Sequence, residues 1–251
     1  METKKIIITG GATRIGKAIA LGLANYNTQI VIHYSKSFND AKKLKKELEN
    51  LGSIVHLLKA DLNNHKQTQK IISYAYKKMK GLNCLVNNAS VFENDNLYNF
   101  SNTSFSKHIN INLKAPAILT RDFSRIYKGK AGNIINIIDQ RVEKLTPFFL
   151  SYTLSKSGMV TLTKTSAMKL APNIRVNAIS PGPTLKNKRQ SEIHFKKQWK
   201  STILRKKVET KNICSAVKFL IDNSNITGQV INVDSGQRLA WKTPDIINTK
   251  E

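Results

Sequence analysis

The sequence contains little cysteine and no long apolar segment. Its two cysteines, Cys84 and Cys214, are too few for a disulfide scaffold and lack the spacing of metal ligands, so we expect two small core residues and no metal site. No apolar run approaches the ~20 residues that span a bilayer. The isoleucine-rich run near the N-terminus is too short for the apolar core of a signal peptide. These absences predict a cytoplasmic protein with no membrane partner.

Acidic residues are also scarce, because 16 Asp and Glu stand against 41 Lys and Arg and give a net charge of +25. Such a charge is typical of nucleic-acid-binding proteins. The lysines are, however, spread along the whole chain, without a basic tail or an interleaved series of aromatic residues for base stacking. In the densest run, residues 41–52, apolar residues recur with helical spacing and leave the lysines on the solvated face. We therefore expect no nucleic-acid partner, and a positive field that attracts anions such as phosphorylated cofactors.

Patterns typical of strands and helices alternate along the chain. Short apolar runs predict strands, and apolar residues with helical spacing predict the helices between them. The expected strands are residues 4–9, 29–34, 54–59, 82–87, 133–138, 174–179 and 229–233, and the expected helices are residues 14–25, 40–51, 67–78, 105–127, 151–170 and 208–222. This alternation predicts an α/β fold, a Rossmann-like, doubly wound, seven-stranded parallel sheet with helices on both faces.

Two segments show neither pattern. Residues 181–204 are polar and basic and follow the sixth expected strand, at the edge where such sheets bind ligands. We expect a long loop there, with residues 183–204 as a substrate loop. Residues 237–251 are expected to form a C-terminal tail. No repeat or low-complexity linker divides the chain, so residues 1–251 are predicted to form a single domain.

The stretch ITGGATRIG, residues 8–16, joins the first expected strand to the first expected helix. Gly10 and Gly11 permit a tight turn and a close approach of the backbone to a pyrophosphate, and Gly16 permits close packing of helix on sheet. The helix N-terminus offers unpaired N–H groups and a positive dipole to the phosphates. The motif therefore predicts a dinucleotide-binding turn, in which Arg14 is unusual because another small residue is more common there.

The second expected strand ends in VIHYSKS, residues 31–37, without an acidic residue. NAD-specific folds of this kind carry an acid here for the ribose hydroxyls of adenosine. Ser35, Lys36 and Ser37 instead offer two hydroxyls and a cation, which suit a 2′-phosphate, although a plain polar loop is the alternative. We therefore expect NADP(H) rather than NAD. After the third strand, Asp61 is placed to meet the adenine edge.

The stretch SYTLSK places Tyr152 and Lys156 one helical turn apart, at the start of the long helix after the fifth strand. A tyrosine has an ordinary pKa of about 10, and a nearby ammonium favours the phenolate by charge attraction. Lys156 is also able to reach the ribose hydroxyls of a nicotinamide cofactor. A tyrosine four residues before a lysine is common in proteins and means little alone. The prediction of acid–base chemistry therefore rests on the position of this pair at the start of the helix that follows the fifth strand.

With these motifs in place, the sequence resembles the short-chain dehydrogenase/reductase family over nearly its whole length. The matching motifs are TGGATRIG, NNAS, NLKAP with Asn112, SYTLSK and SPGP, in that order. The resemblance implies a dinucleotide-binding reductase domain, hydride transfer from NAD(P)H and a homotetramer. It also implies that Asn112 supports a water-mediated proton path to Lys156. The residues expected to bind NADP(H) are Gly10, Arg14, Ile15, Gly16, His33, Tyr34, Ser35, Lys36, Ser37, Asp61, Leu62, Asn88, Ala89, Ser90, Lys156, Pro181 and Gly182.

Two residues depart from the family pattern. Asp139 stands where most members have a serine, and an ionised aspartate only accepts hydrogen bonds, so it gives no donor to a carbonyl oxygen. A carboxylate hydrogen-bonded to Tyr152 is able instead to hold and relay a proton. Arg14 is the second departure. Taken together, the two departures resemble the pattern of the pteridine reductases and the related dihydromonapterin reductases. These enzymes pair an arginine in the glycine motif with an aspartate at the serine position.

The resemblance to this subgroup implies a pterin site. Phe92 would stack on the pterin and hold it against the nicotinamide, and Ser90 would hydrogen-bond the pterin and the cofactor phosphates. Arg14 would face pyrophosphate and pterin together. The segment VDSGQRL fits less well, with Ser235 where glycine is usual. The expected substrate-binding residues are Arg14, Ser90, Phe92, Asp139 and Tyr152, and the expected catalytic residues are Asp139, Tyr152, Lys156 and Asn112.

Each unusual residue also has a plain structural interpretation: Phe92 as a core aromatic, Asp139 as a local cap and Arg14 as a solvated helix residue. The favoured function is reduction of a pterin-like C=N bond by NADPH. A carbonyl reductase, such as a 3-oxoacyl thioester reductase, is the alternative, which Asp139 disfavours. A non-catalytic nucleotide- or RNA-binding protein on a reductase scaffold is a third hypothesis. Only the positive charge supports it, and the retained Tyr152 and Lys156 oppose it.

Overall fold

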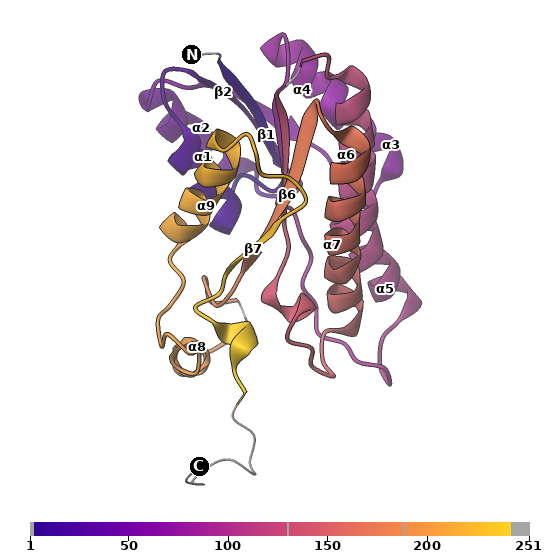
Figure 1. Cartoon of the computed structure of the whole chain (residues 1–251), viewed down its shortest axis with the longest axis vertical. Coiled ribbons are helices and arrows are strands. Elements are labelled where there is room, and N and C mark those ends of the chain that lie inside the picture. The colour runs from indigo at the N-terminus through magenta and orange to yellow at the C-terminus, as the bar shows by residue number, and fades with distance from the viewer. Residues whose placement is uncertain (1–2, 130, 188, 242–251) are drawn as a thin grey trace, which may run out of the picture.

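A sheet of seven parallel strands forms the centre of the computed structural model, which describes residues 3–129, 131–187 and 189–241 (Figure 1). The strand order is β3-β2-β1-β4-β5-β6-β7. The chain order reverses between β1 and β4, and open α/β sheets bind ligands at such a switch point. The predicted doubly wound, Rossmann-like fold is therefore confirmed. The strands are β1 (Lys4–Ile8), β2 (Thr28–Tyr34), β3 (Ile54–Lys59), β4 (Cys84–Asn87), β5 (Gly132–Ile137), β6 (Ile174–Pro181) and β7 (Val230–Val233).

Helices cover both faces of the sheet. On one face lie α1 (Arg14–Leu23), α2 (Phe38–Asn50) and α9 (Thr210–Asp222), and on the other lie α4 (Ile71–Met79), α6 (Ala115–Ile126) and α7 (Leu150–Leu170) (Figure 1). In β1, Ile6 and Ile8 join the first buried cluster and Ile7 joins the second, because successive side chains of a strand point to opposite faces. This two-sided burial is the reason that the strands read as continuous apolar runs.

The helix expected over residues 105–127 is interrupted in the structure. It consists of α5 (Asn102–Ile109), a π-helical turn (Asn110–Lys114) and α6, which begins with Pro116 in its first turn. Proline has no N–H group and its ring clashes with the carbonyl four residues earlier, so a regular α-helix cannot pass through this position undisturbed. The π turn absorbs the irregularity, and it places the buried side chain of Asn112 against the site described below.

The segment expected to be a loop, residues 181–204, contains a helix that the sequence pattern did not reveal. This helix, α8 (Glu192–Lys200), begins at Ser191, whose side chain accepts a hydrogen bond from the backbone N–H of His194 at 3.1 Å. Of its side chains, only Phe195 is fully buried. One buried residue gives no apolar periodicity, which explains why the helix was missed.

Other expectations concern the cysteines and the tail. Cys84 and Cys214 are free and buried, as predicted.

A short 3₁₀ turn (Gln237–Leu239) follows β7, and its start is held by the buried carboxylate of Asp234, which accepts hydrogen bonds from the backbone of Gly236 and Arg238. The remainder of the expected tail, residues 242–251, lies outside the described residues. Of the helices that the structure describes, none has both the length and the apolar character needed to cross a membrane.

Candidate active site

A cleft of about 1220 Å³ runs along the carboxyl ends of the strands. Ordinary small-ligand pockets have roughly 300–1,000 Å³, so this cleft has room for a dinucleotide and a second molecule. Asn112 is the only predicted site residue that does not line it. The predicted residues that do line it are Gly10, Arg14, Ile15, Gly16, His33, Tyr34, Ser35, Lys36, Ser37, Asp61, Leu62, Asn88, Ala89, Ser90, Phe92, Asp139, Tyr152, Lys156, Pro181 and Gly182.

The glycine turn between β1 and α1 is closely packed against the end of β4. Gly10 has a φ of 59°, a left-handed conformation that favours glycine. A Cβ at Gly16 would lie 2.3 Å from the carbonyl oxygen of Gly10 and 2.6 Å from the side-chain nitrogen of Asn88, so only glycine fits there. Asn88 in turn donates to the carbonyls of Thr9 and Gly10. The turn therefore has the compact, fixed backbone that a pyrophosphate site requires.

His33, at the end of β2, supports the glycine turn from below. Its Nδ1 accepts a hydrogen bond from the backbone N–H of Gly10 at 3.1 Å, and its Nε2 lies 3.1 Å from the carbonyl oxygen of Ala60. These partners assign a neutral ring with the proton on Nε2. Burial lowers the pKa of His33 to about 4, which keeps the ring neutral. Both nitrogens are used within the protein, so His33 positions the turn rather than offering a free group to a ligand.

The segment that follows the same end of β2 carries the predicted phosphate-binding residues. Ser35 and Lys36 are exposed at the cleft, and Ser37 precedes the first residue of α2. Asp61 is also exposed, and its carboxylate accepts a hydrogen bond from the backbone N–H of Asn63. The structure thus brings two hydroxyls and one ammonium to the same cleft end, where they are able to hold a 2′-phosphate.

Arg14 has an unusual backbone conformation and two specific contacts. Its φ of 54° lies in the left-handed region, which costs a non-glycine residue roughly 1–2 kcal/mol. Its guanidinium donates to the carbonyl oxygens of Leu185 and Lys186, at 3.1 and 3.0 Å, in the segment after β6. Arg14 therefore joins the glycine turn to the predicted substrate loop. Arg14 is exposed, as the interpretation of a solvated helix residue expects, but it also makes these two specific hydrogen bonds.

Tyr152, Asp139 and Lys156 meet at the bottom of the cleft, where α7 begins beside the end of β5. The phenol Oη of Tyr152 donates to Oδ2 of Asp139 at 2.9 Å. The other carboxylate oxygen of Asp139 accepts the backbone N–H of Arg141 at 2.9 Å, so Asp139 is a local cap as well as a partner of Tyr152. Lys156 donates to the carbonyl oxygen of Ile137 at 2.8 Å, and its Nζ lies 5.7 Å from the centre of the Tyr152 ring.

Burial dominates the ionisation of these three groups. Burial and the negative charge of Asp139 raise the pKa of Tyr152 well above 10, so the phenol keeps its proton. Burial lowers the pKa of Lys156 to about 8, with Asp139 acting in the opposite direction. Burial also raises the pKa of Asp139, against the hydrogen bond and charge of Arg141. Burial and Asp139 therefore keep Tyr152 protonated in this arrangement, and the expectation that Lys156 favours the phenolate stays a prediction.

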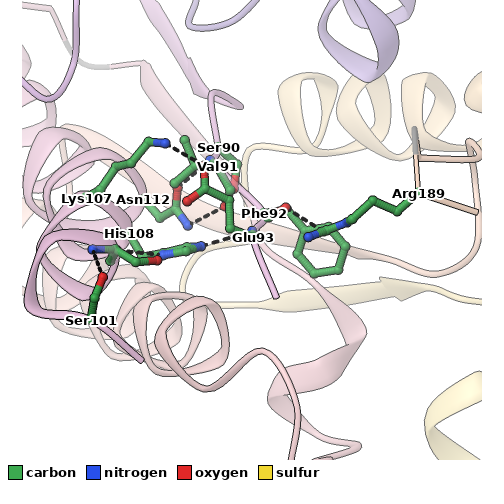
Figure 2. Close-up of polar contacts among 10 residues, drawn as sticks. Ser90, Val91, Phe92, Glu93, Ser101, Lys107, His108, Asn112 and Arg189 are labelled. Atoms are coloured by element: carbon green, nitrogen blue, oxygen red, sulfur yellow. Dashed lines mark hydrogen bonds and ion pairs between the residues drawn. The ribbon is translucent and has the colours of Figure 1, made fainter. Parts of the chain in front are cut away.

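Asn112 fixes the segment that follows β4. Its amide oxygen accepts the backbone N–H of Val91 at 2.8 Å, and its amide nitrogen donates to the carbonyl of Val91 and to Oγ of Ser155. One turn earlier on the same helix, His108 accepts the backbone N–H of Glu93 (Figure 2). Asn112 therefore positions Ser90 and Phe92 from outside the cleft, although it does not contact Lys156 directly.

Phe92 lies in the cleft next to Tyr152, but its ring already has an aromatic neighbour. It stacks on Phe149 with ring centres 4.4 Å apart and planes inclined by 11°. Its contact with Tyr152 is edge to face, at 4.6 Å. Phe92 is only partly buried and lines the cleft, so it is not a simple core residue. Because Phe149 covers one face of the ring, a planar ligand could stack only on the opposite face.

Three lining residues, Arg141, Phe149 and Arg189, were not predicted from the sequence. Both guanidiniums lie over the stacked rings of Phe92 and Phe149. Arg141 and Phe149 lie between the predicted catalytic residues in the sequence, and this position could have indicated them. Arg189 lies within residues 183–204, the predicted substrate loop, but its contact with Phe92, 97 residues away, was not predictable from the sequence.

The chain matches the model of the short-chain dehydrogenase family over residues 4–197. Among curated proteins, it is 33% identical to a 3-oxoacyl-[acyl-carrier-protein] reductase from Buchnera aphidicola subsp. Baizongia pistaciae, over 93% of this chain and 97% of that protein. It is 24% identical to a dihydromonapterin reductase from Enterobacter sp. (strain 638), over 94% of this chain and 97% of that protein.

Solved structures give a similar result. The FolM alternative dihydrofolate reductase 1 from Brucella canis, complexed with NADP, is 38% identical, with a TM-score of 0.92 and coverage of 96% of both chains. The corresponding Brucella suis enzyme, also in complex with NADP, is 39% identical, with a TM-score of 0.93 and coverage of 97% of this chain and 98% of that chain. The motif order, the Tyr152–Lys156 geometry and these matches agree, and the chain belongs to the short-chain dehydrogenase family.

Proposed function

We propose that this protein is an NADPH-dependent reductase of a pterin-like substrate, a dihydropterin such as dihydromonapterin or dihydrofolate, and that it reduces a C=N bond. The observation that carries this proposal is the 2.9 Å hydrogen bond from Tyr152 to Asp139. A carbonyl reductase needs a hydrogen-bond donor at position 139, and an ionised carboxylate would repel a developing alkoxide. Reduction of a C=N bond instead needs a proton for the ring nitrogen, and a phenol supported by a carboxylate supplies one.

The cleft fits NADP(H). The tight turn at Gly10 and Gly16 would hold the pyrophosphate, Ser35, Lys36 and Ser37 the 2′-phosphate, and Lys156 the nicotinamide ribose. The Brucella relatives were both crystallised with NADP, which supports the same cofactor here. When bound, the reduced cofactor supplies the hydride.

The protein residues would handle the proton. Tyr152, whose raised pKa keeps the phenol protonated until substrate binds, would donate this proton to the ring nitrogen as the hydride reaches carbon. The carboxylate of Asp139 would orient the phenol, and Lys156 would return a proton from the side away from the substrate. Asn112 would support the proton path from solvent to Lys156, and Arg14 and Ser90 would bind pterin and cofactor together.

The rival function is that of a 3-oxoacyl thioester reductase. The 33% identity to such an enzyme from Buchnera favours it. The dihydromonapterin reductase relative is less identical, at 24%, but the FolM relatives reach 38–39%. Arg14, Phe92 and Asp139 together favour the pterin substrate, because a thioester reductase has no use for a carboxylate next to the catalytic tyrosine.

One experiment separates these functions. NADPH oxidation is followed with dihydromonapterin, dihydrobiopterin, dihydrofolate and acetoacetyl thioesters under the same conditions. We expect turnover of at least one dihydropterin and little of the thioester. Turnover of the thioester alone would contradict the proposal, and an absence of turnover together with tight, salt-sensitive RNA binding would favour the binding protein instead.

Three further properties belong to the same proposal. Residues 1–251 would form one reductase domain, four copies would assemble as a homotetramer, and the enzyme would act in the cytoplasm without a nucleic-acid partner. Resemblance to the family supports the first two. Light scattering on the purified protein tests the assembly, because a tetramer has four times the 28.2 kDa of one chain.

A further inference from the structure

Two arginines and two phenylalanines form a corner at the substrate end of the cleft, which we call the arginine corner: Phe92, Arg141, Phe149 and Arg189. The guanidinium carbons of Arg141 and Arg189 both lie within 5.7 Å of both ring centres. All four residues line the cleft that contains Tyr152. They come from three separate segments, after β4, after β5 and after β6, so only folding brings them together.

The two guanidiniums have unused hydrogen-bonding capacity. Arg189 donates to the carbonyl oxygen of Phe92 at 2.7 Å (Figure 2), and Arg141 donates to the hydroxyl of Thr146 at 3.3 Å. Each guanidinium has five N–H donors. In the part of the chain that the structure describes, neither forms an ion pair within 4.0 Å, and Arg141 donates to Asp139 through its backbone N–H rather than through its guanidinium.

The neighbouring cation Lys107 provides a contrast. Lys107 also lines the cleft, but its ammonium is paired with Glu93, so its charge is already compensated (Figure 2). Among the described residues, no carboxylate lies within 4.0 Å of either guanidinium of the arginine corner, although the charge of Arg141 acts on Asp139, and the rings hold the two guanidiniums in place by cation–π contacts. A guanidinium that rests on an aromatic ring still presents its N–H edge, which binds a carboxylate through two parallel hydrogen bonds.

We propose that the arginine corner binds the carboxylates of an aromatic, carboxylate-bearing arm attached to the pterin ring. The protein would therefore select folate-type substrates over pterins with a short neutral side chain. Phe149 suits the flat benzoyl group of such an arm, while Phe92 remains the contact for the pterin ring, and Arg141 and Arg189 suit the two carboxylates of the arm. This inference rests on the proposed pterin reductase function. It states that the arginine corner, which does not contact the C=N bond that is reduced, determines which pterin substrate the enzyme prefers.

The test compares two substrates in one set of variants. The values of kcat/KM for dihydrofolate and dihydromonapterin are measured with NADPH for the wild type, Arg141→Gln, Arg189→Gln and the double variant. Because hydrogen bonds to charged groups contribute about 1.5–3 kcal/mol, each substitution is expected to lower kcat/KM for dihydrofolate by roughly tenfold or more. The value for dihydromonapterin should change much less. Arg141 also lies beside Tyr152, so the ratio of the two substrates is the quantity that matters.

Lys196→Gln is the matched control. Lys196 is exposed on α8 and does not line the cleft, so this variant removes one positive charge nearby without touching the arginine corner. We expect the substrate ratio to stay at its wild-type value. An equal fall of the ratio in Lys196→Gln and Arg189→Gln would overturn the proposal, because it would reflect the general positive field. A ratio unchanged in the double variant would overturn it as well.

A binding measurement distinguishes failure of this inference from failure of the proposed function. The NADP-loaded enzyme is titrated calorimetrically with p-aminobenzoyl-glutamate, which has the carboxylate-bearing arm and no pterin ring. We expect binding that is lost in the double variant. If no dihydropterin is turned over, the proposed function fails, and this titration still tests the arginine corner. Equal binding by the wild type and the double variant would refute the carboxylate assignment. It would also be refuted if the substitutions lowered acetoacetyl-thioester turnover more than folate turnover.

Discussion

The cofactor end of the cleft is formed by short segments of backbone, whereas the substrate end is formed by side chains from distant parts of the chain. At the cofactor end, Gly10 and Gly16 lie within one motif, and His33 and Asn88 support it through hydrogen bonds to the same few backbone groups. At the substrate end, the phenyl ring of Phe92 meets the guanidinium of Arg189, 97 residues away.

This difference determines which amino-acid substitutions each end of the cleft can accept. A dinucleotide phosphate is recognised by N–H groups and by space, so the cofactor end depends on the few residue types that permit a particular backbone path. A substrate is recognised instead by side-chain groups, such as carboxylates, guanidiniums and aromatic rings, which residues from different parts of the chain can supply. The substrate end therefore depends on side chains rather than on a backbone path, and Asp139, where the family resemblance leads one to expect a serine, lies at this end.

The largest effect is expected for Asp139→Ser at the substrate end. The substitution removes the carboxylate that holds Tyr152 and supplies the donor that a carbonyl substrate needs. Because positioned acid–base groups contribute roughly 10²–10⁴-fold, we expect kcat/KM for a dihydropterin to fall by about 10²-fold or more, with the fold and NADPH binding intact. Steady-state kinetics and cofactor titration measure this. Unchanged pterin turnover would remove Asp139 from the mechanism. Tyr152→Phe, measured alongside, should abolish turnover of both substrate types.

The next effect concerns His33 and the pH dependence of stability. The folded protein holds the pKa of His33 at about 4, below the ordinary value of 6.5 for histidine, so between these values the unfolded chain binds a proton that the folded state does not. The free energy of unfolding should therefore fall as pH decreases through this window, by up to about 3 kcal/mol from His33 alone.

Denaturant unfolding of the wild type and His33→Asn at several pH values measures this contribution. Asparagine keeps an acceptor near the position of Nδ1 and does not titrate, so we expect a smaller loss of stability between pH 6.5 and 4 in this variant. His65→Asn is the control, because His65 is exposed. Parallel pH profiles for the wild type and His33→Asn would show that His33 does not carry this effect.

A smaller effect is expected for Lys36→Asp at the cofactor end. The substitution replaces the cation that would face the 2′-phosphate by an anion that repels it and that suits a free ribose. Because a charge-assisted hydrogen bond contributes about 1.5–3 kcal/mol, the preference for NADPH over NADH should fall by at least about tenfold. Fluorescence titrations with both cofactors measure the preference. An equal change in affinity for the two would contradict the phosphate assignment.

The smallest effect is expected for Arg14, which joins the two ends. Arg14→Ala and Arg14→Gly both release the segment at Leu185 and Lys186, so KM for a dihydropterin should rise several-fold in each. The glycine variant also relieves the left-handed backbone at this position and should be about 1 kcal/mol more stable than the alanine variant. Pterin kinetics and thermal unfolding separate the two roles. Wild-type KM in both variants would reduce Arg14 to a structural residue.

Much of the cofactor end could be predicted from the sequence. The glycine turn follows from residues close together in the chain, and the strands that carry it are continuous apolar runs. Tyr152 and Asp139 were also identified, and their hydrogen bond is present. The raised pKa of Tyr152 was not predictable from the sequence, because it follows first from burial of the phenol and then from its contact with Asp139, and both arise only on folding. The helix α8 was missed because it buries only Phe195.

The sequence by itself determined the doubly wound sheet, the dinucleotide-binding turn and the pair of Tyr152 and Lys156, because alternating burial and backbone geometry are encoded locally. Only the tertiary structure showed that Arg14 holds the segment after β6 and that Arg141 and Arg189 share the rings of Phe92 and Phe149. The physical reason is that such contacts arise where the carboxyl ends of several strands converge. Their residues are neighbours in space and not in the chain.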